Sequence, residues 1–154
     1  MMIRTIQDSS AKQHIARTVL EELTEWFSIP EAREDYIRRS AEMLMIASFE
    51  DEQATGFLCL KETGKDTAEI AVMGVRKEYQ RKGTGTRLFK AAAEAAREKG
   101  YSFLQVKTVQ EGWYEEYDRT NAFYRSLGFK EFEVIPDLWD EHNPCQIYAM
   151  SLCR

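Results

Sequence analysis

The chain has 154 residues and a formal net charge of −5, with 44% hydrophobic and 31% charged residues. This balance is typical of a soluble globular protein, and the length fits one domain, residues 1–154, around a single hydrophobic core. No apolar run approaches the ~18 residues of a membrane-spanning helix, and the opening MMIRTIQDSS has no apolar signal core. We therefore expect a cytoplasmic protein that is not bound to a membrane.

The cysteines and histidines do not form a metal-binding pattern. There are three cysteines, an odd number without CxxC spacing, and two histidines that lack ligand-like spacing. Two of the cysteines lie in apolar or β-like runs, which favours buried free thiols in a reducing compartment over disulfides. We predict no metal ion.

The charge is polarised along the chain. The window from Arg76 to Lys90 has one acid, Glu78, and six basic residues: Arg76, Lys77, Arg81, Lys82, Arg87 and Lys90. The rest of the chain has 15 basic and 25 acidic residues. Nucleic-acid binding needs a broad basic face, so this local cationic site better suits a compact polyanionic small molecule.

The N-terminal half alternates strand and helix signals. Residues 2–7 predict a short strand, and Ser9 or Ser10 can cap a helix that runs to about Trp26. Pro30 fits the first turn of a second helix, EAREDYIRRS. Strand-like runs separated by polar turns follow at residues 43–49, 56–61 and 67–75.

The C-terminal half begins with an alanine-rich helix over residues 84–99, which Gly100 ends. We expect a strand over 102–108, a loop over 109–118, a short helix over 120–127 and closing strands over 129–135 and 146–152. This element order predicts an α/β (α+β) protein with a mixed sheet flanked by helices.

The stretch EYQRKGTGTRLFK places Gly83 and Gly85 at the start of the alanine-rich helix. The first N–H groups of a helix have no internal partner and attract anions, and no acid occupies this first turn. A Walker loop is absent, and a dinucleotide fingerprint fails because Leu88 stands at its third glycine. A plain turn with solvated basic side chains is the alternative.

The hexamer QRKGTG, Gln80 to Gly85, resembles the Q/R-x-x-G-x-G/A signature of the GNAT superfamily of N-acetyltransferases. The strand AEIAVMGV precedes it, and the later segment NAFYRSLGF resembles the second cofactor segment of that family. The element order agrees over nearly the whole chain. The resemblance implies a single-domain GNAT-like fold, with a mixed, mostly antiparallel sheet of about six to seven strands that is splayed between the fourth and fifth strands.

The resemblance also implies acetyl-CoA as co-substrate in a V-shaped gap of the sheet. The pantetheine arm would pair with the backbone of Met73, Gly74 and Val75, like an added strand. Asn121 would touch the cofactor, and Arg125 would face its phosphates together with Arg81 and Lys82. The pyrophosphate segment would be Gln80, Arg81, Lys82, Gly83, Thr84, Gly85 and Thr86.

Two residues are candidates for acid–base chemistry. Tyr124 matches the position of the family's general acid, which protonates the CoA sulfur, and a core tyrosine is the alternative. Glu69 would take the ammonium proton directly or through water, and the alternative is a strand glutamate in solvent or paired with a base such as Lys107. A backbone N–H near Met73 or Val75 would polarise the acetyl carbonyl.

The segment EGWYEEYD suggests the acceptor. Trp113, Glu115 and Glu116 combine aromatic rings and carboxylates, a pairing that suits a cationic amine, although a solvated acidic surface is the alternative. Trp26 and the rest of residues 26–36 would form the opposite wall. We expect a small-molecule amine, a polyamine, an aminoglycoside or a protein lysine as acceptor.

These observations predict an N-acetyltransferase that moves an acetyl group from acetyl-CoA to a primary amine by direct attack in a ternary complex. No cysteine lies where a covalent intermediate would need one. The alternatives are a catalytically inactive CoA-binding sensor or interaction module, and a nucleotide-binding protein with an unusual phosphate loop. The β-rich C-terminus is compatible with a homodimer.

Overall fold

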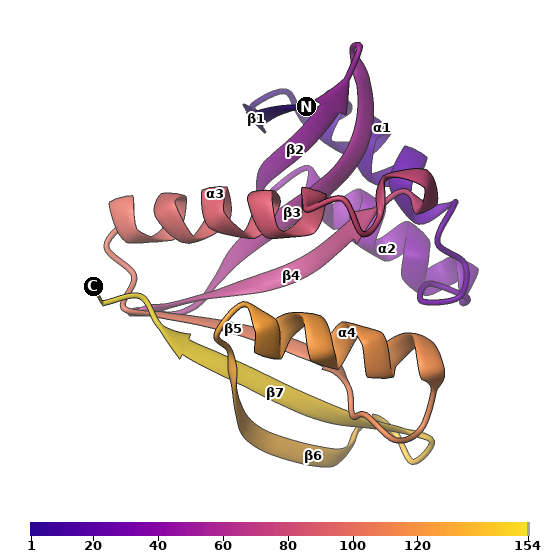
Figure 1. The fold of residues 1–154 in the computed structure, drawn as a ribbon, viewed down its shortest axis with the longest axis vertical. Helices are drawn as coiled ribbons and strands as arrows, with labels where there is room; N and C mark the ends of the chain where they lie inside the picture. Colours follow the sequence, from indigo (N-terminus) through magenta and orange to yellow (C-terminus); the bar gives the residue numbers. More distant parts are fainter. Residues whose placement is uncertain (154) are drawn as a thin grey trace.

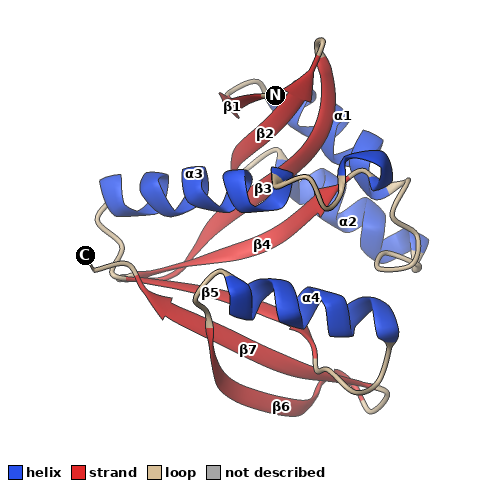
Figure 2. Cartoon of the chain, viewed as in Figure 1, coloured by secondary structure: helices blue, strands red, loops and turns tan. Residues whose placement is uncertain are grey.

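A computed structural model describes residues 1–153, which form one seven-stranded sheet and four α-helices (Figures 1 and 2). The strand order is β1-β2-β3-β4-β5-β7-β6, and only the β4–β5 pair is parallel. No helix of this part of the chain is long and apolar enough to cross a membrane. The elements are β1 (Met2–Ile6), α1 (Ser9–Leu20), α2 (Pro30–Ser40), β2 (Leu44–Glu50), β3 (Gln53–Gly64), β4 (Thr67–Val75), η1 (Lys77–Tyr79), α3 (Thr84–Glu98), β5 (Phe103–Val109), α4 (Glu115–Ser126), β6 (Lys130–Asp140) and β7 (Asn143–Ser151).

The mixed, mostly antiparallel sheet confirms the expected fold class, but two helix boundaries were predicted wrongly. α1 ends at Leu20 rather than near Trp26, and its cap is Asp8, whose side chain accepts from the N–H of Ala11. α4 begins at Glu115, inside the segment expected to be a loop. Acids in its first turn favour that start because they complement the positive end of the helix dipole.

The two faces of the sheet have separate hydrophobic cores. α3 packs on one face together with Tyr124 of α4, over side chains from the centre of the sheet such as Leu58 and Leu104. α1 and α2 pack on the opposite face, around Phe57 and Met45. α3 and α4 therefore lie on the same side of the sheet, and the two N-terminal helices lie behind it (Figure 1).

The sheet opens between its two parallel strands. β4 and β5 pair only from Thr67 with Phe103 to Ile70 with Val106. Beyond these residues β4 and β5 continue without pairing to each other, and they diverge as Figure 1 shows. A register shift in the β3–β4 ladder beside this point skips Ala71, which is the signature of a β-bulge. The bulge and the divergence leave the last five residues of β4 without a ladder partner on the β5 side.

Candidate active site

A strained turn joins β4 to α3. Arg81 has a φ of 62° and Gly83 a φ of 83°, so two residues of the turn adopt the left-handed conformation. Such strain at a non-glycine residue is uncommon and concentrates at functional sites. The side-chain amide of Gln80 donates to the carbonyl of Val75 at 2.8 Å, which ties the turn to the strand end. Turns of this kind point backbone N–H groups toward a common anion site.

The start of α3 is positively charged, and no acid within residues 1–153 pairs with this charge. Gly83 is the N-cap, no side chain caps it, and no acid lies in the first turn. Arg81, Lys82 and Arg87 are exposed, and none of them forms an ion pair within residues 1–153. Free N–H groups, the helix dipole and unpaired cations together favour a bound polyanion such as a pyrophosphate.

Gly83 and Gly85 are required in the turn for different structural reasons. A side chain at Gly83 would meet nothing within 4 Å, so its positive φ is what requires glycine. A Cβ at Gly85 would lie 3.0 Å from the ring of Phe123 in α4. Gly85 therefore lets α3 and α4 pack together beside the expected pyrophosphate segment.

The free edge of β4 lies next to this turn. Met73 and Val75 are half-buried, whereas Gly74 is buried against α1. A Cβ at Gly74 would lie 2.9 Å from Leu23 and 3.0 Å from Val19, so only glycine allows α1 to pack this closely. The unpaired edge of β4 is thus held in place by the packing of α1 and Leu23 on Gly74, and a fixed strand edge suits the binding of an extended ligand.

The ring of Tyr124 belongs to an aromatic cluster, and its hydroxyl has no hydrogen-bond partner within residues 1–153. Its ring packs at 5.7–6.0 Å from Phe123, Phe129 and Tyr148, and the residue is 7% exposed. No residue of the described chain bonds its hydroxyl, and no unpartnered side-chain polar atom there is fully buried. The hydroxyl therefore reaches accessible space. Burial, with smaller effects from Tyr36 and Tyr117, raises the pKa of Tyr124, so it stays protonated.

Glu69 and Lys107 meet where β4 and β5 separate. Glu69 is 6% exposed, and its Oε1 accepts from the Nζ of Lys107 at 2.5 Å. Tyr36 of α2 packs on the same face of the sheet as Glu69. Burial raises the pKa of Tyr36, Arg39 opposes that rise, and the negative charge of Glu69 adds to it. From the sequence, Tyr36 was expected only as the last residue of segment 26–36, the wall opposite the acidic segment. No motif around Tyr36 indicated a place beside Glu69.

The connection between α1 and α2, residues 21–29, bridges the open end of the sheet, and we name it the strap. Trp26 Nε1 donates to the carbonyl of Glu116 at 3.3 Å and to Thr120 Oγ1 at 3.2 Å. The hydroxyl of Tyr117 donates to the carbonyl of Trp26 at 3.0 Å. The ion pairs Glu22–Arg76 and Glu25–Lys77, at 2.9 and 3.0 Å, hold the strap to the end of β4.

The acidic segment at the start of α4 makes contacts within the protein but keeps exposed carboxylates. Glu115 pairs with Arg119 at 3.4 Å yet is 89% exposed, and Asp118 accepts from the N–H of Gly112 at 2.7 Å. Trp113 is 52% exposed, and the backbone carbonyl of Glu116 accepts from Trp26. The structure places these expected acceptor contacts next to the strap.

Two expected cofactor contacts already have partners within the protein. Asn121 is fully buried, and its amide bonds Val109, Tyr117 and Tyr148 at 2.7–2.8 Å, which leaves no N–H of that amide for a ligand. Arg125 bonds Tyr148 at 3.1 Å and pairs with Glu111 at 2.9 Å. Its side chain is 40% exposed, and a guanidinium has five N–H donors, so Arg125 keeps donors for a phosphate.

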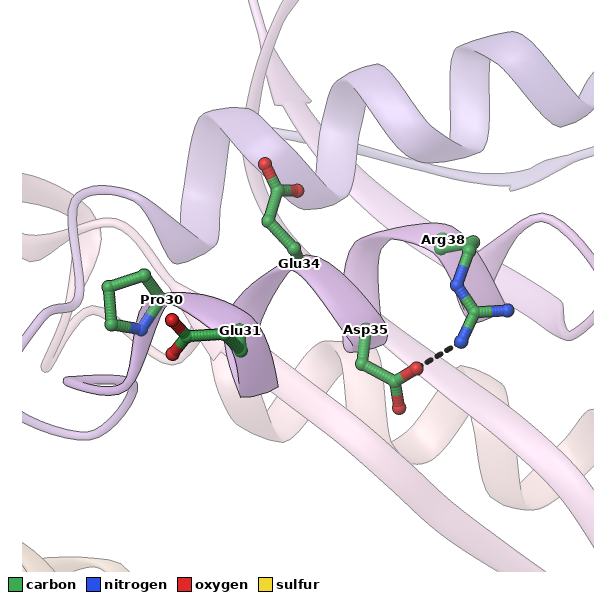
Figure 3. Close-up of a pocket in the computed structure, with 5 residues that line it drawn as sticks. All are labelled: Pro30, Glu31, Glu34, Asp35 and Arg38. Atoms are coloured by element: carbon green, nitrogen blue, oxygen red, sulfur yellow. Dashed lines mark hydrogen bonds and ion pairs between the residues drawn. The ribbon is translucent and has the colours of Figure 1, made fainter.

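A shallow hollow on α2 lies apart from these groups (Figure 3). Its lining includes Glu31, Glu34 and Asp35, and Figure 3 shows Asp35 joined to Arg38. It contains neither the glycine turn nor Tyr124, so it does not belong to the site. No group of three or more potential metal-binding side chains occurs within residues 1–153.

The assembled site defines a class of protein, and comparisons with known proteins identify the family. Residues 13–129 match the model of the acetyltransferase (GNAT) family. The chain therefore belongs to this family, as the resemblance of its hexamer indicated. No curated protein sequence matches significantly.

Solved structures share the fold at low identity. A GNAT-family protein from Desulfovibrio desulfuricans has a TM-score of 0.87 and 18% identity, over 99% of each chain. An aminoglycoside 6'-N-acetyltransferase complexed with coenzyme A has a TM-score of 0.76 and 16% identity, over 100% of this chain and 98% of that one. The ribosomal-protein-S18-alanine N-acetyltransferase from Escherichia coli has 0.78 and 17%, over 99% and 96%.

Proposed function

We propose that this protein is an N-acetyltransferase that moves the acetyl group of acetyl-CoA to a primary amine. The observation that carries the proposal is the uncapped, basic start of α3 beside the free edge of β4, with the open hydroxyl of Tyr124 on the same face of the sheet. A pyrophosphate suits the first feature, an extended pantetheine the second and a leaving thiolate the third. A related fold that binds coenzyme A supports this assignment.

The residues divide the chemistry between them. Glu69 Oε2 accepts a proton from the acceptor's ammonium, directly or through water, which frees the nitrogen lone pair. The amine then attacks the thioester carbonyl, whose oxygen is stabilised by a backbone N–H near Met73 or Val75. As the C–S bond breaks, Tyr124 gives its proton to the sulfur. The nitrogen releases its second proton to water, and Tyr124 is reprotonated from water. An amide and a free thiol result, and no covalent enzyme intermediate forms.

The pyrophosphate would be held by the backbone of residues 81–86 and by the side chains of Arg81 and Lys82. Gln80 acts indirectly, because its amide is bonded to Val75. We leave Asn121 out of the ligand contacts because it is buried and its amide is bonded within the protein, whereas Arg125 stays a candidate phosphate contact.

The acceptor is a primary amine, either of a small molecule or of a protein lysine. Relatives of this fold are an aminoglycoside acetyltransferase and a ribosomal-protein-S18-alanine acetyltransferase, so their names give one small-molecule and one protein acceptor. The acids near Trp113 suggested a cationic acceptor; Asp118 is engaged within the protein, whereas Glu115 is exposed on the surface. The charge of the acceptor is better judged from the residues at the reacting position.

A thermal-unfolding scan with acetyl-CoA, CoA, ATP and NAD tests the cofactor. A ligand at 100 times its dissociation constant stabilises a protein by about 2.7 kcal/mol, which is enough to raise the midpoint by a few degrees. We expect a shift with both CoA species and none with ATP or NAD. Lys82→Gln should weaken the shift, whereas Lys99→Gln, at the far end of α3, should not. A shift with ATP or NAD alone would contradict the assignment.

Acetyl transfer to a panel of primary amines, followed by release of free CoA thiol, separates an enzyme from a CoA-binding sensor or interaction module. We expect turnover with some amine. If acetyl-CoA binds and none of the amines is acetylated, the binding module becomes the better description.

A further inference from the structure

The Glu69–Lys107 ion pair spans the point at which the sheet opens. Val106 is the last residue of β5 that pairs with β4, and Lys107 is the first beyond it. Its side chain reaches back to Glu69 on β4, one residue before the end of the paired segment. This position lies opposite the face that carries α3, α4 and Tyr124, because neighbouring residues Ile70 and Val106 belong to that other core. An acceptor that approaches from the α2 side meets this pair first.

Both partners have hydrogen-bonding capacity left. An ammonium has three N–H donors, and the bond to Glu69 is the only one that Lys107 forms within the described chain. Its side chain is 28% exposed. Glu69 uses Oε1 for Lys107, and its Oε2 has no partner among residues 1–153 yet is not sealed from solvent. The site therefore offers free N–H donors and a free carboxylate oxygen side by side.

The charges at this point restrict the acceptor. A substrate ammonium at Glu69 would lie close to the ammonium of Lys107, and like charges at short distance repel. Arg39, near Tyr36 on the same side of the sheet, is paired with Asp35 at 3.3 Å, so Lys107 is the cation that faces the acceptor at Glu69. The nearby Cys145 is uncharged, because burial raises the pKa of its thiol to about 11. A negative group on the acceptor, next to its amine, would balance Lys107.

We propose that the acceptor is an amine that carries its own carboxylate beside the amino group, as an α-amino acid does. The amine donates to Oε2 of Glu69 and the carboxylate accepts from Lys107, so that each charge of the zwitterion meets its opposite. The inference rests on the proposed acetyltransferase function and narrows its acceptor. It replaces the cationic acceptor that the acidic segment suggested.

Matched substrates isolate the contribution of the carboxylate. Acetyl transfer is measured with pools of the common α-amino acids, their C-terminal amides and the corresponding decarboxylated amines, with CoA thiol release as the readout. We expect the amino acids to be acetylated with a kcat/KM about tenfold or more above the amides and amines, the size of a lost hydrogen bond to a charged group. Equal or faster turnover of the amides or amines overturns the inference.

Variants then assign the effect to Lys107. Lys107→Gln keeps a hydrogen-bond donor for Glu69 but removes the charge, and it should lower kcat/KM for the best amino acid more than kcat/KM for the decarboxylated partner. Lys107→Arg should restore part of that difference. Lys130→Gln, an exposed lysine of β6 with no ion pair within residues 1–153, is the matched control. An equal loss on both substrates in Lys107→Gln would overturn the role in recognition.

The same series distinguishes this inference from the proposed function. Turnover of amines or amides, without the amino acids, contradicts the zwitterionic acceptor and leaves the acetyltransferase assignment intact. Turnover of no pool contradicts the acceptor class as well, and the thermal scan with acetyl-CoA then decides whether the CoA site survives. Each variant is first compared with the wild type in that scan, so that a folding defect is recognised.

Discussion

Tyr124 combines a buried ring with an accessible hydroxyl. Its ring is packed by three aromatic neighbours, so burial raises its pKa, and its hydroxyl stays accessible without a protein partner. A phenol that stays protonated can give its proton to a thiolate as the thiolate leaves. The two readings weighed from the sequence, a core tyrosine and a general acid, are therefore compatible in this structure.

Tyr124→Phe should lower kcat by about 100-fold or more, the lower range for loss of a general acid, and leave the KM for acetyl-CoA nearly unchanged. Steady-state kinetics with thiol release measure both. Tyr101→Phe is the control, because that hydroxyl bonds Glu62 at 2.6 Å outside the site. Because burial raises the pKa of Tyr124, its ionisation should not reduce activity between about pH 7 and 9. Wild-type kcat in Tyr124→Phe would contradict the assignment.

Gly85 and Gly83 should respond differently to substitution by alanine. Gly85→Ala forces a contact with Phe123 and should cost about 1–3 kcal/mol of unfolding free energy, the range for overpacking. Phe123→Leu should recover part of that cost in a double-mutant cycle measured by urea unfolding. Gly83→Ala should cost about 1–2 kcal/mol through its positive φ, without coupling to Phe123. Additive effects at Gly85 and Phe123 would disprove the packing argument.

At the scale of elements, the strap and α4 act across the gap that β4 and β5 leave open. The four paired positions of β4 and β5 join the two halves of the sheet at one end. Trp26 and Tyr117 join them at the other end through hydrogen bonds of 3.0–3.3 Å. The strap therefore limits how far the two halves can separate when a cofactor and an acceptor enter.

Trp26→Phe removes the indole N–H and with it the two hydrogen bonds that this N–H donates to α4. The bond from Tyr117 to the carbonyl of residue 26 remains. We expect faster amide hydrogen exchange in α4, with little change in α3, because α4 loses a tether to the N-terminal half. Trp139→Phe is a matched control in β6, where the side chain is 46% exposed. Hydrogen-exchange mass spectrometry reports both helices in one experiment. Unchanged protection of α4 would show that the indole hydrogen bonds of the strap do not stabilise α4.

The whole molecule combines a cationic turn with an otherwise acidic chain of net charge −5. The basic side chains at the α3 start remain unpaired, while many acids elsewhere are held in ion pairs. A field of this shape attracts a polyanion to one point of the surface and repels it elsewhere.

The thiols should report on the packing of the whole domain. Cys59 and Cys145 are buried and Cys153 is exposed. Burial raises the pKa of Cys59 to about 12 and that of Cys145 to about 11, so neither forms the reactive thiolate readily. A thiol-reactive dye at neutral pH should label only Cys153 quickly in the folded protein, and Cys153→Ser should remove that fast phase. Fast labelling of a second thiol would contradict the packing.

The same thiols predict how stability depends on pH. A raised pKa in the folded state means that folding disfavours the thiolate, so the contribution of Cys59 is complete below its ordinary value of 9.0 and is lost as the pH rises toward 12. Urea unfolding at about pH 7.5 and 10 should show a lower unfolding free energy at the higher pH. Cys59→Ala should make this decline shallower, whereas an unchanged slope would contradict the assignment.

Local sequence was sufficient for the fold and for the basic glycine turn. The hexamer from Gln80 to Gly85, an acid-free first turn and the order of strands and helices are all properties of short segments, whose backbone preferences do not depend on distant contacts. These features led to the GNAT family before any tertiary contact was known, and the family match agrees.

Only the tertiary structure decided how the side chains of the site are used. Lys107 and Glu69 are 38 positions apart, and Trp26 and Glu116 are 90 apart. Packing of the helices on the two faces of the sheet brings such pairs together, and no local pattern encodes the result. The same packing turns Asn121 into a buried support, and it places a lysine beside the carboxylate expected to act as a base. A single sequence specifies each segment's backbone, whereas the partners of a polar side chain depend on how all the segments pack.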